Sequence, residues 1–82
     1  PTISIATPAD ESAHAQGAVV NSDFSCSDSA SGVATCVGTT PDGSPIDTAT
    51  LGAKTFNVST TDNLGNSSSL TNDYSVFEVV ME

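Results

Sequence analysis

The sequence predicts an all-β fold, an antiparallel β-sandwich of about seven short strands in one domain of residues 1–82. Short apolar runs alternate with serine and threonine, as in half-buried strands, and no stretch keeps the apolar spacing of a helix over even three turns. Turn-forming residues interrupt the chain every 8–12 residues or so, a spacing typical of sandwiches. Eighty-two residues are also too few for a second independent core.

Three strands are predicted in the first half of the chain. Two isoleucines alternate with small polar residues in the first strand, which Pro8 ends. A polar stretch over residues 9–17 separates it from the second strand. The third strand follows a turn over residues 27–32, because Asp and Ser bond their own backbone and Gly32 accepts positive φ. The predicted strands cover residues 2–7, residues 20–26 with Val20, Ser22, Phe24 and Cys26 on one face, and residues 33–38.

Four further strands are predicted in the second half. A Pro-Asp-Gly turn at residues 41–43 predicts a short hairpin partner after it. Phe56 and Val58 share one face of a longer strand. The last strand has an imperfect apolar phase, which predicts either a bulge near Val76 and Phe77 or burial of both faces. These strands cover residues 45–47, 48–51, 54–61 and 70–80.

The charge balance excludes several classes of partner. Ten acidic side chains against one basic side chain leave a net charge of −9. With Lys54 as the only strongly basic side chain, nothing neutralises a row of phosphates or holds the chain on an anionic membrane. No apolar run approaches the ~20 residues that span a bilayer, and residues 1–7 lack signal-peptide character. We expect no nucleic acid, no membrane insertion, and a soluble piece excised from a larger multidomain protein.

The two cysteines compensate for a thin core. Leu, Ile, Val and Phe together number 17 of 82 residues, close to the ~20% floor of folded domains. Nine residues separate Cys26 from Cys36 across a turn, and a disulfide there stabilises the fold by roughly 2.5–3 kcal/mol. Two thiolates with His14 cannot complete a zinc site, and the spacing is not that of a redox motif. A disulfide implies an oxidising compartment, so we expect an extracellular or cell-surface protein.

Two segments carry a resemblance to a known family. In residues 55–66 an alternating strand runs into the pattern Asp-x-x-Gly-Asn, and residues 24–36 combine the paired cysteines with a Ser-Gly-Val turn. Both segments resemble bacterial extracellular immunoglobulin-like modules of the Big/HYR type. The resemblance implies an immunoglobulin-like sandwich and a non-catalytic unit, usually one of several in tandem on a secreted enzyme, adhesin or surface protein.

The loop residues allow two interpretations. Asp62 can accept backbone N–H bonds within its own loop, while Gly65 and Asn66 tolerate a left-handed conformation, so these residues and Gly32 are candidates for organising turns. The alternative is a calcium site, because an immunoglobulin-like sandwich places the B–C and F–G loops at one end. That interpretation makes calcium the only expected cofactor, and its candidate ligands are Asp28, Asp62, Asn63 and Asn66.

Catalysis is not expected. His14 is the only imidazole, lies in a polar stretch and has no visible partner for a Ser-His-Asp relay. The absence of Trp and the single Tyr74 disfavour a sugar cleft. The leading hypothesis is a structural spacer or interaction module that contacts neighbouring domains of its own chain. The alternatives are an adhesion module that binds a protein or polysaccharide through the B–C and F–G loops, and self-assembly through the apolar tail of residues 76–81.

Overall fold

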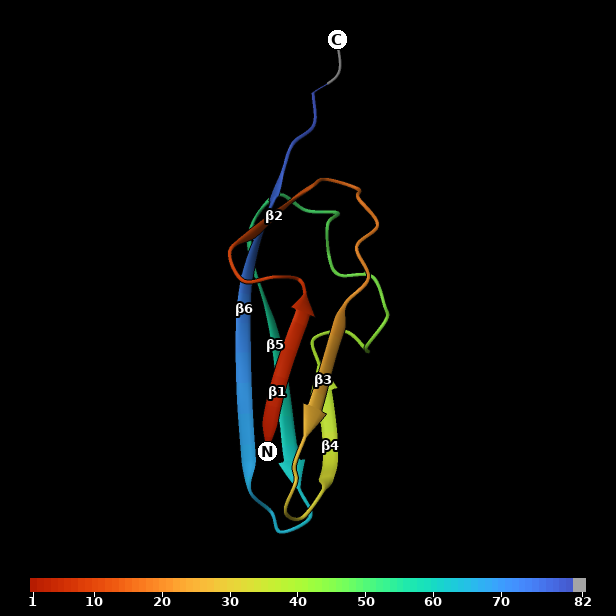
Figure 1. Ribbon diagram of the computed structural model, residues 1–82. Coiled ribbons are helices and arrows are strands. Elements are labelled where there is room, and N and C mark those ends of the chain that lie inside the picture. Colours follow the sequence, from red (N-terminus) through yellow and green to blue (C-terminus); the bar gives the residue numbers. More distant parts are fainter. Residues whose placement is uncertain (81–82) are drawn as a thin grey trace.

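The computed structural model describes residues 1–80 and shows an all-β domain with two sheets (Figure 1). One sheet pairs β1 with β3, and the other has the order β2-β6-β5-β4. The all-β prediction is confirmed, but the described residues form six strands and not seven. The strands are β1 (Thr2–Thr7), β2 (Ser12–Ala15), β3 (Asp23–Ser27), β4 (Val33–Gly38), β5 (Gly52–Asp62) and β6 (Ser67–Phe77).

One small core lies between the two sheets. On β5 the alternate residues Phe56, Val58 and Thr60 are buried, as their period of two predicts. Isoleucines of β1 are half-buried against this cluster, so both sheets share the same core. The buried apolar side chains are Phe24, Ile46, Phe56, Val58, Tyr74 and Val76.

Covalent and polar contacts join the edges of the two sheets. The predicted disulfide is confirmed: Cys26 of β3 is bonded to Cys36 of β4, with the Cα atoms 6.0 Å apart. On the opposite side β1 lies beside β6. There the Asn72 amide donates to the Pro8 carbonyl at 3.0 Å, and the Ser68 hydroxyl donates to the Pro1 carbonyl at 3.2 Å. The two sheets are therefore held together on both sides of the small core, by the disulfide on one side and by these hydrogen bonds on the other.

The segment between β4 and β5 differs from the prediction. The strands expected at 45–47 and 48–51 are absent, and residues 39–51 form a loop with a single antiparallel bridge between Asn21 and Pro45. Proline has no N–H to donate, so it does not support a longer ladder. Residues 20–22 belong to this loop contact, and β3 accordingly starts at Asp23.

The polar stretch 9–17 contains a strand that the sequence did not indicate. Four residues, Ser12–Ala15, form β2 and pair in parallel with β6, so the fold is not wholly antiparallel. Backbone contacts hold the preceding turn, since Glu11 N–H donates to the Asp73 carbonyl and the Asp10 carboxylate accepts from Asp73 N–H. A strand of four residues without a bulky apolar side chain is too short to produce a recognisable period.

The last strand is regular. β5 and β6 pair from Gly52–Val76 to Thr61–Ser67 without a register shift, so the predicted bulge is wrong. Burial of both faces is also wrong, because Phe77 is 50% exposed. The imperfect apolar phase arises because β6 ends at Phe77 and the later valines lie beyond the sheet. Met81 of the predicted apolar tail lies outside the described residues.

Candidate functional site

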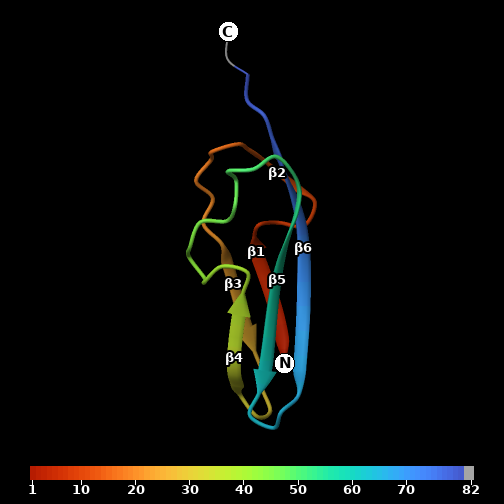
Figure 2. The ribbon, with the colours of Figure 1, turned by 180° about the vertical axis from the view of Figure 1, so that it is seen from behind.

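The turns that follow β3 and β5 meet at one end of the molecule (Figures 1 and 2). The Asn63 side chain donates to the Ser31 carbonyl at 2.6 Å, and its backbone N–H donates to the Gly32 carbonyl at 3.2 Å. We call this region, residues 28–32 and 62–66, the loop end. Asn63 thus joins two loops that are about thirty residues apart in the chain.

Asp62 organises the second of these loops. One carboxylate oxygen accepts from Leu64 N–H at 2.9 Å and from Asn66 N–H at 2.8 Å, and the other accepts from the Asn66 side chain at 2.9 Å. The bond from the Asn66 side chain, together with these backbone bonds, lowers the pKa of Asp62 from 3.8 to about 2. Asp62 is therefore ionised at neutral pH and holds the loop closed.

Asp28 has the same role in the first loop. Its Oδ1 accepts from Ala30 N–H at 2.9 Å and from Ser31 N–H at 3.1 Å, and its Oδ2 lies 3.3 Å from the Pro1 amino group. The bonds from Ala30 and Ser31 lower the pKa of Asp28 below its ordinary value. Both carboxylates thus bind N–H groups of their own turns.

The calcium hypothesis stays a prediction. Among residues 1–80 no group of three or more His, Cys, Asp or Glu side chains is placed to hold a metal ion. At Asp62 both carboxylate oxygens accept N–H bonds, so a cation there would compete with Leu64 and Asn66. The Asn63 amide nitrogen faces Ser31 and so leaves its own oxygen as the remaining ligand atom.

Glycine is required in both loops. Gly32 and Gly65 have φ values of 82° and 89°, in the left-handed region that strains a residue with a Cβ. At Gly32 a Cβ would also lie 3.0 Å from the Asn63 amide nitrogen. Gly32 therefore serves both its own turn and the contact between the loops.

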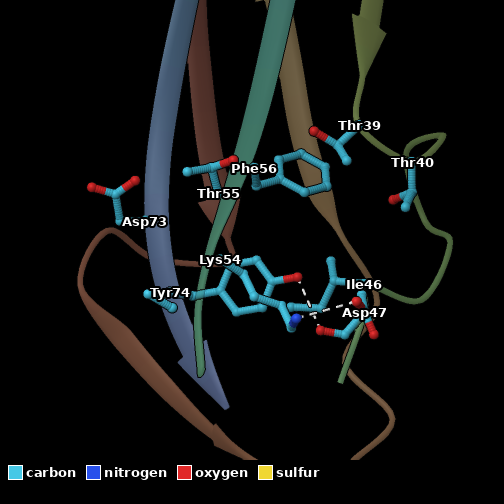
Figure 3. Close-up of a pocket in the computed structure, with 10 residues that line it drawn as sticks. Thr39, Thr40, Ile46, Asp47, Lys54, Thr55, Phe56, Asp73 and Tyr74 are labelled. Carbon is cyan, nitrogen blue, oxygen red and sulfur yellow. Dashed lines mark hydrogen bonds and ion pairs between the residues drawn. The ribbon is translucent and has the colours of Figure 1, made fainter. Parts of the chain in front are cut away.

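An open groove of about 650 Å³ lies beside β5, away from the loop end (Figure 3). One wall is the loop 39–51, and the other is the part of β5 that extends past β4. This groove was not predicted, because strands were expected where the loop lies. The concentration of Pro41, Gly43 and Pro45 was the available signal, since these residues break ladders. The groove is lined by Thr39, Thr40, Ile46, Asp47, Ala53, Lys54, Thr55, Phe56, Asp73 and Tyr74.

Polar contacts cross the bottom of the groove. Lys54 Nζ lies 3.4 Å from Asp47 Oδ2 and donates to the Thr50 hydroxyl, and the Tyr74 hydroxyl donates to the Asp47 carbonyl at 3.0 Å (Figure 3). The bond from Ala49 N–H, aided by Lys54, lowers the pKa of Asp47. Burial, with a smaller effect of Asp47, raises the pKa of Tyr74. Asp47 therefore connects the loop 39–51 to β5 through Lys54 and to β6 through Tyr74.

His14 lies on β2 and not in a loop. The expectation that it has no visible partner is also wrong. Its Nε2 is 3.0 Å from the Ser12 hydroxyl, and its ring packs edge-on against Tyr74 with the centroids 5.9 Å apart. In residues 1–80 no carboxylate hydrogen-bonds to this imidazole. Ser12 and His14 therefore form a pair that lacks the third group of a relay.

Comparison with known protein families, with curated proteins and with solved structures finds no match for this chain. Within residues 1–80, no helix has the length and apolar character to cross a membrane.

Proposed function

We propose that this protein is a non-catalytic, immunoglobulin-like structural module that spaces its neighbours within a larger bacterial secreted or cell-surface protein. The observation that carries the proposal is the elongated path of the chain, whose overall dimensions are 56 × 18 × 15 Å. Residue 1 lies near the loop end, and residues 78–80 leave at the opposite end (Figure 1). Modules connected through these two ends extend a chain rather than fold back on it.

The strand order supports the immunoglobulin-like assignment. In that fold strands C, F and G are neighbours in one sheet, and A and B belong to the other. Here β4, β5 and β6 take the C, F and G places, and β1 and β3 take those of A and B. The loop 39–51 replaces the D and E strands, which makes this a reduced version of the fold.

Bonds between the two sheets suit a spacer that must resist being pulled apart. The disulfide joins β3 to β4, and Asn72 and Ser68 join β6 to the segments at both ends of β1. A disulfide persists in oxidising surroundings, which supports an extracellular or cell-surface location. The acidic excess gives like-charged neighbours that repel one another, so successive modules stay apart.

Solution scattering from chains that carry one, two and three tandem copies tests the spacer role. We expect the maximum dimension to grow by about the 56 Å module length with each copy. In a matched chain, a long flexible Gly/Ser linker separates the copies. For each residue added, this linker should increase the average distance between the ends of the chain less than a folded module does. Tandem copies that pack side by side, with little growth in maximum dimension, would contradict the proposal.

The loop end supports a second candidate, recognition of a protein or polysaccharide. Asn63 holds two loops together there, and Leu64 at the tip is 78% exposed. A rigid pair of loops with an exposed apolar tip is a suitable recognition surface. Screening the domain against a glycan array and against cells tests this role, with Leu64→Ser as the loop variant and Val37→Ser as the control away from the loops. Equal binding by both variants would exclude the loop end.

A further inference from the structure

Part of the β5 edge is covered by no strand. β4 pairs with β5 from Asp62 to Val58, and Thr39 then takes both backbone bonds of Asn57, donating its N–H to the Asn57 carbonyl and accepting Asn57 N–H with its hydroxyl. Because alternate residues direct their backbone groups to the same side of a strand, Thr55 and Ala53 direct theirs to this edge too. No strand within residues 1–80 pairs with them there.

The groove beside this edge is apolar and nearly neutral. Ile46 and Phe56, which are 4% and 1% exposed, lie at its apolar floor, and the Asp47 carboxylate is paired with Lys54, the only Lys or Arg of the chain. Asp73 also lines the groove, so its carboxylate is the one acidic group of the described lining that Lys54 does not pair with. In a protein with a net charge of −9, the groove is therefore a place where an apolar, weakly acidic strand meets little repulsion.

A segment with matching properties leaves the same end of the sheet, since Val76 pairs with Gly52. β6 ends at Phe77, whose carbonyl accepts from Gln16 N–H, and residues 78–80 have no strand partner among the described residues. They continue beyond the body in Figure 1. Phe77, Val79 and Val80 are 50%, 52% and 75% exposed. Unpaired backbone and exposed β-branched side chains make this segment prone to strand addition.

We propose that residues 77–80 of one copy add as a strand to the open β5 edge at residues 53–55 of a second copy. The added strand would satisfy the backbone groups of Ala53 and Thr55 and bury Val79 or Val80 near Phe56. The donor segment and the acceptor edge lie at the same end of the molecule, so a one-way contact links copies into open chains and a reciprocal exchange closes a two-fold dimer. This association goes beyond the spacer role and does not depend on it.

The net charge makes the association sensitive to salt. Two copies with a charge of −9 repel at long range, and added salt screens this repulsion. We therefore expect the sedimentation coefficient of the full chain to rise with concentration more steeply at high than at low ionic strength. A chain that stays monomeric at high salt and millimolar concentration would overturn the proposal.

A labelled peptide of residues 75–82, titrated with dilute monomeric full chain, tests the donor strand directly. We expect saturable binding that unlabelled peptide competes and a scrambled peptide does not. Two further peptides carry N-methyl groups on either the odd or the even residues. Since a strand bonds its neighbour through alternate residues, one N-methylated peptide should lose binding and the other should keep it. Equal behaviour of the two would exclude strand addition.

Variants of the full chain test the acceptor edge. Ala53→Glu puts a like charge beside the incoming Glu78 and should weaken peptide binding about tenfold. Ala34→Glu makes the same change on exposed β4, outside the groove, and should leave binding within about twofold, with circular dichroism showing both variants folded. Val79→Ser with Val80→Ser in the full chain should abolish association but preserve binding of the wild-type peptide. Association that persists in these variants, or closed dimers that ignore Ala53→Glu, would overturn the proposal.

Discussion

The Asn63 amide donates to the Ser31 carbonyl across 2.6 Å, and this bond connects the turn after β5 with the turn after β3. The contact depends on Gly32, because a Cβ at that position would lie 3.0 Å from the same amide nitrogen. Gly32 in one loop and Asn63 in the other therefore form one structural unit. Substitution of either residue should perturb both loops.

Gly32→Ala should destabilise the fold more than Gly43→Ala does. Both glycines have φ near 83°, so alanine costs each about 1–2 kcal/mol of backbone strain. A Cβ at Gly43 has no atom within 4 Å, whereas at Gly32 it displaces Asn63 and weakens a hydrogen bond of about 1 kcal/mol. Urea unfolding should show this difference, and Asn63→Ala should remove it. Equal losses in the two alanine variants would disprove the coupling.

Asp62→Asn should lower stability at neutral pH and flatten the acid limb of the stability curve. The folded-state pKa of about 2 lies below the unfolded value, so the Asp62 contribution is present above about pH 4 and is lost as pH falls from 4 to 2. Urea midpoints measured across this range should fall less steeply in the variant. Glu78→Gln is the control, because this exposed residue lies outside the strands and should leave the slope unchanged.

Tyr74→Phe should cost about 1 kcal/mol at neutral pH, because it removes the hydroxyl that donates to the Asp47 carbonyl. The pKa of Tyr74 is raised in the folded state, so its contribution is intact below about pH 10 and is lost as pH rises further. The variant should lack this alkaline loss. Phenolate absorbance measures the titration directly, since the chain has one Tyr. A midpoint below 10 would contradict the structure.

Reduction of Cys26–Cys36 should lower the free energy of unfolding by roughly 2.5–3 kcal/mol. The bond ties the two-stranded sheet to β4, so amide exchange should accelerate most in β1 and β3. Reductant should have no effect on the Cys26→Ala, Cys36→Ala double variant, which controls for other actions of the reagent. Unchanged exchange in β1 would show that Asn72 and Ser68 alone hold the small sheet in place.

Strands with a clear period of two were predictable from sequence. The segments 2–7 and 33–38 match β1 and β4, and the alternation of Phe56 and Val58 located β5. On β1 and β5 one face meets the core, whereas β4 has no buried residue and is held by its pairing with β5. At the loop end, Asp62 and Gly65 were recognisable because their hydrogen bonds and φ preference are local properties of the turn.

Long-range contacts decided what the sequence did not show. β2 exists because β6 offers an edge for parallel pairing, although Ser12–Ala15 has little strand signal of its own. Residues 48–51 have strand-like composition but donate and accept bonds to residues 16–18, so the edge of β5 stays open. Alternation and turn chemistry act between near neighbours in the chain, and the sequence by itself therefore determined the class of fold, the disulfide and the turns. The groove, the parallel strand and the seam between β1 and β6 arise from segments brought together only on folding, so the tertiary structure alone decided them.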